Sequence, residues 1–143
     1  MDGRVMAIDP GEKRIGISLS DLTATLAAPF AVIRHVAMAE DCQKIVEIAK
    51  QNQVTVIVIG QALGGEGEST PQSRHSQKMA EAIRRLVDIP VVLWDESGST
   101  RDAQKIARRN LANRKARSGH LDDHAAAVLL QDYLDTVALK DMA

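Results

Sequence analysis

Three acidic positions along the chain have the residue types and the spacing for phosphodiester chemistry. Asp9 ends the apolar run at residues 5–8, and Asp95-Glu96 directly follow a second apolar run at 90–94. Asp122 lies four residues before Ala126, on the expected buried stripe of the last helix. If that helix crosses the sheet at the ends of these strands, three carboxylates meet there and raise each other's pKa. Oxygen ligands of this kind suit Mg²⁺ or Mn²⁺, and two such ions can drive phosphodiester cleavage.

Each acid also has an ordinary structural interpretation. Asp9-Pro10-Gly11 is a common turn sequence, and Asp122 is an acid that the dipole at a helix N-terminus favours. Only the convergence of the acids in space indicates a site, and that convergence is a prediction about the fold. Asp95 and Glu96 point to opposite faces of a regular strand, so either can be the ligand from the second run.

The elements that would bring the acids together follow from the apolar periodicity. Strands are expected at 4–9, 14–20, 30–36, 54–59 and 90–94. Helices are expected at 39–51, from Pro71, from Ser99 or Thr100 to about Leu111, and from Leu121. A hairpin-rich start followed by strand–helix alternation predicts an α/β fold, with a five-stranded mixed sheet whose first three strands are antiparallel and whose faces carry helices. The 143 residues predict a single domain spanning 1–143.

Composition narrows the class of protein. The chain has only three aromatic residues, Phe30, Trp94 and Tyr133, which argues against a single-strand binder that stacks bases on aromatic rings. Its single cysteine, Cys42, cannot form an internal disulfide and fits a reducing compartment. The chain begins without a signal-peptide hydrophobic region, and no apolar run approaches membrane-spanning length. We therefore expect a cytoplasmic protein without a membrane partner.

The distribution of charge indicates a polyanionic partner, although the net charge is only −1. Between residues 101 and 119 there is one acid, Asp102, among seven basic residues: Arg101, Lys105, Arg108, Arg109, Arg114, Lys115 and Arg117. Such a segment can be a solvated helix face and loop, but beside an acidic metal site it would help nucleic acid approach. The loop from Gly60 to Ser73 lacks the lysine of a Walker A motif, so it is not a P-loop.

Four separated motifs together resemble the YqgF/RuvX family. They are MAIDPG at 6–11 with RIGI at 14–17, the loop from Gly60 to Ser73, WDE at 94–96 with Ser99-Thr100, and LDDHAAAVLLQDYL at 121–134. The resemblance implies an RNase H-like fold, similarity to the RuvC Holliday-junction resolvases, and a nuclease that matures the 5′ end of pre-16S rRNA.

The resemblance also assigns roles to residues. It implies that Asp9, Glu96 and Asp122 are the catalytic, metal-binding acids, with Asp95 as the alternative to Glu96. We add Lys13 and Arg14 of the first hairpin to the basic segment as nucleic-acid contacts. Ser97-Gly98 stand where the family typically has Arg-Leu, so an arginine that could contact phosphate or brace the carboxylates is missing.

Other functions remain open from the residues. A Holliday-junction resolvase uses the same chemistry on DNA, and symmetric cutting of two strands predicts a homodimer, against which a monomer would count. A non-catalytic RNA-binding module is another alternative. A relative of the actin-like ATPases would share an Asp-x-Gly hairpin, but those enzymes bind ATP between two duplicated domains and this chain has the length of one.

Overall fold

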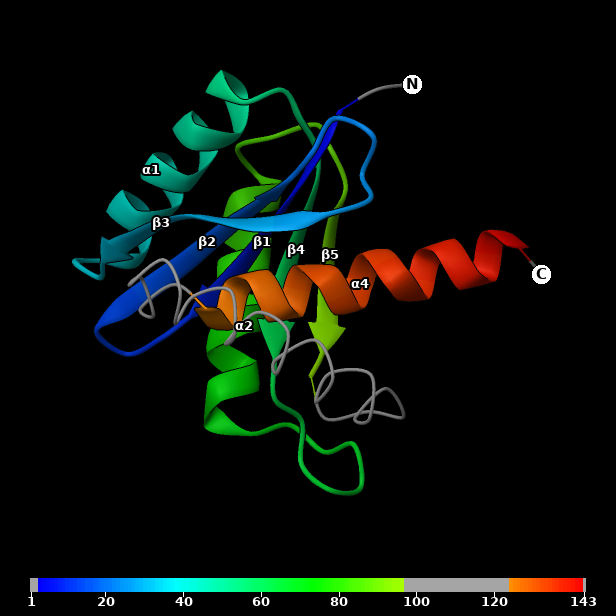
Figure 1. The fold of residues 1–143 in the computed structure, drawn as a ribbon. Helices are drawn as coiled ribbons and strands as arrows, with labels where there is room; N and C mark the ends of the chain where they lie inside the picture. Colours follow the sequence, from blue (N-terminus) through cyan, green and yellow to red (C-terminus); the bar gives the residue numbers. More distant parts are fainter. Residues whose placement is uncertain (1–2, 97–123, 143) are drawn as a thin grey trace.

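The chain folds as a sheet flanked by helices in a computed structural model that describes residues 3–96 and 124–142 (Figure 1). The elements are β1 (Arg4–Pro10), β2 (Arg14–Ser20), β3 (Ala27–Arg34), α1 (Met38–Gln51), β4 (Val54–Gln61), α2 (Pro71–Arg84), β5 (Val91–Asp95) and α4 (His124–Met142). The helix expected between residues 99 and 111 lies outside the described residues, as does the expected start of the last helix at Leu121.

The five strands form one mixed sheet in the order β3-β2-β1-β4-β5. β1 pairs antiparallel with β2, and β2 pairs antiparallel with β3, whereas β4 lies parallel to both β1 and β5. The prediction of a five-stranded mixed sheet with three antiparallel strands first is confirmed. The parallel strands β1, β4 and β5 end at the same edge, so the residues that follow each apolar run are neighbours there.

The two faces of the sheet are covered differently. α1 and α2 pack on one face over Met6, Ile8, Ile57 and Ile59, all fully buried. α4 crosses the other face, where it covers a smaller cluster that includes Val5, Ala7 and Val58 (Figure 1). Because successive side chains of a strand point to opposite faces, Asp9 continues the Val5–Ala7 row on the α4 face.

β3 lies earlier in the chain than predicted, at Ala27–Arg34 in place of 30–36. It is an edge strand, so Pro29 can sit within it without breaking a ladder on both sides. Its start is held by Gln131 of α4, whose side-chain oxygen accepts a hydrogen bond of 2.9 Å from the Ala27 N–H. Its end is set by the Asp41 carboxylate, which accepts from the Val36 N–H at 3.0 Å. The contact with Gln131 joins residues 104 positions apart, which a local pattern does not reveal.

α2 begins as its sequence predicts. Thr70 is the N-cap, its hydroxyl accepts from the Ser73 N–H at 3.0 Å, and the Ser73 hydroxyl accepts from the Thr70 N–H at 2.8 Å. Pro71 occupies the first turn, where its missing N–H has no cost. Within residues 3–96 and 124–142, no helix combines enough length with enough apolar character to reach across a bilayer.

Candidate active site

Asp9 lies at the end of β1, where three small residues let α4 approach the sheet. Its register partner on β2 is Gly16. A Cβ built on Gly16 would lie 3.4 Å from the Cβ of Ala126 and 3.8 Å from that of Asp9. Two residues along β2, the Ser18 hydroxyl donates a 2.7 Å hydrogen bond to the Ala126 carbonyl. The first turns of α4 are therefore fixed beside Asp9.

Glu96 follows β5 and extends its pairing by one residue, since its N–H donates to the Gln61 carbonyl at 3.0 Å. Its carboxyl group lies over Gly60 of β4. A Cβ on Gly60 would come within 2.7 Å of Glu96 Oε1 and 2.8 Å of Leu129 Cδ2, so only a glycine leaves room for both groups. Since Leu129 belongs to α4, Glu96 lies on the same face of the sheet as Asp9.

The side chain of Asp95 points to the face of the sheet opposite to that of Glu96. It is the register partner of Gln61 at the end of β5, between Trp94 and Glu96. The Trp94 ring packs at 5.2 Å, edge to face, against Tyr133, and its Nε1–H donates to Asp132 Oδ2 at 2.8 Å. Because Trp94 faces α4, alternation directs Asp95 toward the other face and Glu96 back toward α4. The geometry thus groups Asp9 with Glu96.

Gly60 separates the two acids. Ile8 of β1 pairs with Ile59 of β4, so Asp9 and Gly60 are the next residues along two neighbouring strands. Asp9 flanks the glycine on one side, and the strand carrying Glu96 flanks it on the other. From the sequence alone, Gly60 ends a strand and opens the loop to Ser73, and its closeness to Glu96 is not visible. The available signal was a glycine directly after the buried β-branched run of residues 54–59.

Burial raises the pKa of the Asp9 carboxyl above its ordinary value, because the charged form loses solvent. In the described ranges no hydrogen bond or ion pair reaches this carboxyl to offset that loss. A divalent cation would do so, and the residues present fit one: two carboxylates lie on the same face of the sheet, and the Glu96 carboxyl group occupies the space over Gly60 that a Cβ would otherwise take. Among the described residues, no three His, Cys, Asp or Glu side chains are grouped closely enough to form a complete metal site.

The third predicted acid, Asp122, lies outside the described residues. So do Ser97, Gly98 and the predicted basic contacts Arg101, Lys105, Arg108, Arg109, Arg114, Lys115 and Arg117. Lys13 and Arg14 are described and exposed, at the turn between β1 and β2. The Lys13 carbonyl accepts from the His35 N–H at 2.9 Å, which fixes the backbone of that turn. Lys13 and Arg14 lie at the same end of the β1–β2 hairpin as Asp9.

A mixed sheet of this order, with acids at the ends of its parallel strands, defines an RNase H-like protein of the RuvC type. The Thermus thermophilus RuvC structure solved in complex with Holliday junction substrate superposes with a TM-score of 0.66, covering 96% of each chain at 10% sequence identity. At that identity the likeness establishes the fold. The predicted RNase H-like class is confirmed.

The chain belongs to the RuvX family, described as "Holliday junction resolvase", whose family model matches residues 3–136. A relative from Roseiflexus sp. (strain RS-1), named "Putative pre-16S rRNA nuclease", is 37% identical over 94% of this chain and 95% of its own length. A Caldanaerobacter subterraneus relative with the same name is 35% identical over 93% and 96%. The chain is thus a nuclease, a hydrolase with a nucleic-acid substrate, as predicted.

Proposed function

We propose that the chain is a divalent-metal-dependent endonuclease that cleaves structured RNA during 5′-end processing of pre-16S rRNA. The observation that carries the proposal is the placement of the Asp9 and Glu96 carboxylates on one face, on either side of Gly60. The names of the relatives supply the substrate. We further propose that residues 1–143 act as one nuclease domain in the cytoplasm, which agrees with the buried free thiol of Cys42.

In this proposal Asp9, Glu96 and Asp122 hold Mg²⁺ or Mn²⁺. Bound there, the metal would lower the pKa of a water and stabilise charge on the leaving oxygen. Asp9 and Glu96 present their carboxyl groups on the face of the sheet that α4 covers, and α4, fixed by the hydrogen bond between Ser18 and Ala126, limits access of bulk water from one side. Asp122 is included because it precedes Ala126 by one helical turn in the sequence.

Substrate phosphates are held by basic side chains in this proposal. Lys13 and Arg14 are exposed next to the end of β1 and would contact the backbone on one side of the cleaved bond. The basic segment from Arg101 to Arg117 would supply the remaining contacts. Binding through phosphates predicts a steep loss of affinity as salt increases.

A Holliday-junction resolvase is the second candidate, favoured by the description of the matched family. Cutting two strands symmetrically needs two copies of the site, so this function predicts a homodimer in solution. The nuclease acting on rRNA has no such requirement. Sedimentation analysis of the protein, alone and with a four-way junction, therefore separates the two candidates.

The experiment that tests the proposal is side-by-side cleavage of a pre-16S rRNA 5′ leader and a four-way DNA junction, each with Mg²⁺, Mn²⁺ or EDTA. We expect metal-dependent cleavage at defined positions of the leader and little cleavage of the junction. Preferential junction cleavage by a dimer would establish the second candidate. Binding without cleavage under every condition would indicate an RNA-binding module, and a thermal shift with ATP alone would favour the ATPase alternative.

Matched variants test which acid acts in the β5 pair. Glu96→Gln removes the charge over Gly60, whereas Asp95→Asn removes a charge one residue away that alternation directs to the other face. We expect Glu96→Gln to lower the cleavage rate on the order of 100-fold, and Asp95→Asn to change it only a few-fold. The reverse ranking would assign the role to Asp95.

A further inference from the structure

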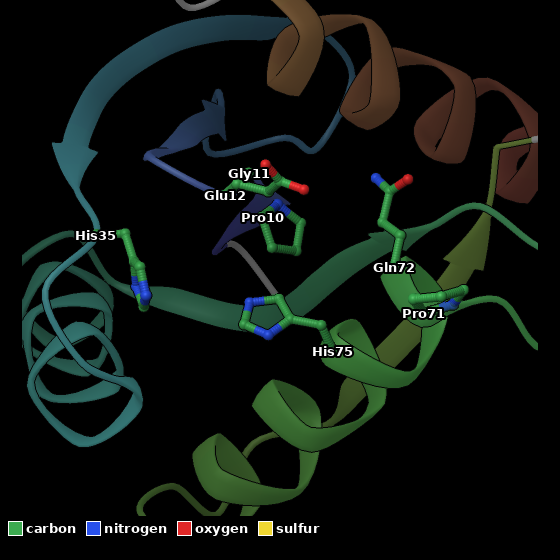
Figure 2. A pocket seen from close by; sticks show the side chains of 7 residues that line it. All are labelled: Pro10, Gly11, Glu12, His35, Pro71, Gln72 and His75. Atoms are coloured by element: carbon green, nitrogen blue, oxygen red, sulfur yellow. The ribbon is translucent and has the colours of Figure 1, made fainter.

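A cavity of about 450 Å³ adjoins the candidate active site on the side away from α4. Its walls are the β1–β2 turn at residues 10–12, the His35 side chain after β3, and Pro71, Gln72 and His75 at the start of α2 (Figure 2). Pro10 directly follows Asp9 in β1. A ligand in the cavity would therefore lie beside a substrate strand bound at Asp9, without displacing the Glu96 carboxyl group over Gly60.

His35 is held in one orientation by a buried acid. Its Nδ1 contacts Asp41 Oδ2, and the other carboxylate oxygen accepts from the Val36 N–H at 3.0 Å. Burial pushes the pKa of Asp41 upward, but its hydrogen bonds with Val36 and His35 outweigh burial and leave that pKa below its ordinary value. The ionised carboxylate can only accept, so the proton lies on Nδ1. The other ring nitrogen and the ring surface of His35 remain available to the cavity.

His75 supplies a second ring at a right angle to the first. The ring centroids of His35 and His75 are 6.3 Å apart, and their planes meet at 85°. A flat heterocycle that stacks on one ring would present its edge to the other. The chain is poor in Phe, Trp and Tyr, yet two of its four histidines line this one cavity. Histidine is among the side chains on which proteins stack unpaired bases.

The remaining polar groups argue against a phosphate as the occupant. Glu12 lines the cavity, and none of the described residues that line it is a lysine or an arginine. The first turn of α2 is already capped by Thr70, which uses one of the N–H groups that an anion would need. Figure 2 shows the side chains of Glu12 and Gln72 on one side of the cavity and the rings of His35 and His75 on the other.

We propose that this cavity binds one unstacked nucleobase of the substrate strand, next to the bond cleaved at Asp9. The base stacks on the imidazole rings, and Glu12 accepts a hydrogen bond from its exocyclic amino group. Adenine, cytosine and guanine carry such a group and uracil does not, so the pocket selects against uracil at this position. The inference rests on the proposed nuclease function and adds a base preference to it.

The first test measures binding without cleavage. The imidazole NMR signals of the four histidines are followed in EDTA while AMP, CMP, GMP, UMP or inorganic phosphate is added. We expect the signals of His35 and His75 to move, with AMP, CMP or GMP binding roughly 10-fold more tightly than UMP. Equal shifts with inorganic phosphate, equal affinity for UMP, or no movement of these two signals would overturn the proposal.

Three variants test which side chains of the cavity contact the nucleotide. Glu12→Gln alters an exposed side chain, so the fold should be retained, and the roughly 10-fold preference against UMP should shrink to about 2-fold. His75→Ala should weaken all four nucleotides several-fold by removing a stacking surface. Gln43→Ala, exposed on α1 outside the cavity, serves as the control and should change neither quantity. Retention of the preference in Glu12→Gln would contradict the assigned role of Glu12.

A cleavage series separates this inference from the proposed function. Leader RNAs that differ only in the base flanking the cleaved bond are compared in the unmodified protein and in Glu12→Gln. We expect uracil to slow cleavage in the first and to matter little in the second. If no RNA is cleaved but the NMR preference holds, the proposed function fails and the base pocket stands. If all RNAs are cleaved equally, the function stands and the pocket is refuted.

Discussion

The two faces of the sheet come from the same strands but differ in the size of their side chains. Toward α1 and α2, β1 and β4 present Met6, Ile8, Ile57 and Ile59, which fill a closed apolar core. Toward α4, the face carries the small residues Gly16 and Gly60 beside the acids Asp9, at the end of β1, and Glu96, after β5. The face toward α1 and α2 stabilises the fold by dense packing. The face toward α4 has smaller side chains, so that carboxylates and a helix can lie close together.

Two aspartates illustrate the same contrast electrostatically. Asp41 is fully buried, but His35 and the Val36 N–H compensate its charge, and its pKa is lowered in spite of its burial. Asp9 is only partly buried, but within the described residues nothing compensates its charge, and burial raises its pKa. A buried carboxylate whose charge is balanced by neighbouring groups stabilises the fold, whereas one whose charge is not balanced by the described residues is suited to bind a cation.

The largest expected effect comes from Asp9→Asn. Loss of this charge should lower metal-dependent cleavage on the order of 100-fold to 1,000-fold, because a ligand of the reacting site is removed. The free energy of unfolding at neutral pH should not fall, since a buried uncompensated charge is removed at the same time. Single-turnover cleavage and urea unfolding measure the two quantities. Asp88→Asn, an exposed substitution of the same kind, is the control. If Asp9→Asn cleaved at the rate of the unmodified protein, the proposal that the α4 face is catalytic and the α1/α2 face structural would be wrong.

The opposite pattern is expected on the α1/α2 face from Ile57→Ala. Ile57 is fully buried in the aliphatic core, so the substitution leaves a cavity and should lower the free energy of unfolding by about 2–5 kcal/mol. Cleavage per folded molecule should change less than about 3-fold, a limit set by its position on the face away from the acids. Ile57→Val should cost about 0.5–1.5 kcal/mol. A loss of activity comparable to that of Asp9→Asn would mean that both faces contribute to catalysis.

Gly60→Ala tests the space between the acids. The added Cβ would lie 2.7 Å from Glu96 Oε1 and 2.8 Å from Leu129 Cδ2, so both groups must move. We expect the free energy of unfolding to fall by about 1–3 kcal/mol and cleavage to fall roughly 10-fold. In Gly65→Ala the new Cβ meets nothing within 4 Å, so this variant is the matched control. If both variants behave alike, the absence of a side chain at Gly60 has no role in placing Glu96.

The sequence predicted the architecture because strands and helices follow from local periodicity. The buried β-branched run at 54–59 and the capped start at Thr70 each specify an element without distant contacts. The bounds of β3 were wrong because its start is held by Gln131, which belongs to a helix far along the chain, and its end by a side chain of the following helix, Asp41.

The candidate site was only partly predictable for the same reason. Acids at the ends of strands are visible in a sequence, so Asp9 and Glu96 could be predicted as candidates. Which member of the Asp95-Glu96 pair faces α4 depends on the exact phase of β5, which the packing of Trp94 against Tyr133 fixes. The roles of Gly16 and Gly60 depend on what lies above them, and α4 is far away in the sequence. The pairing of His35 with His75 likewise joins the end of β3 to α2.

The smallest expected effect, and the most direct test of the contrast between the two aspartates, is the pH dependence of stability. The ordinary pKa of each is 3.8, and the folded protein raises that of Asp9 and lowers that of Asp41. A raised pKa means that the folded chain holds its proton more tightly, so the stability that Asp9 contributes below pH 3.8 is lost as the pH rises through its folded pKa. Asp41 contributes stability above pH 3.8 that is lost as the pH falls through its own folded pKa.

Unfolding free energies measured from acid to neutral pH should therefore diverge in opposite directions. Relative to the unmodified protein, Asp9→Asn should become more stable as the pH rises and Asp41→Asn less stable. Addition of Mg²⁺ at neutral pH should stabilise the unmodified protein, because the cation favours the charged form of Asp9, and should have a smaller effect on Asp9→Asn. If both variants followed the same pH course, or if Mg²⁺ acted equally on both proteins, the Asp9 carboxylate would not be the cation ligand that its surroundings indicate.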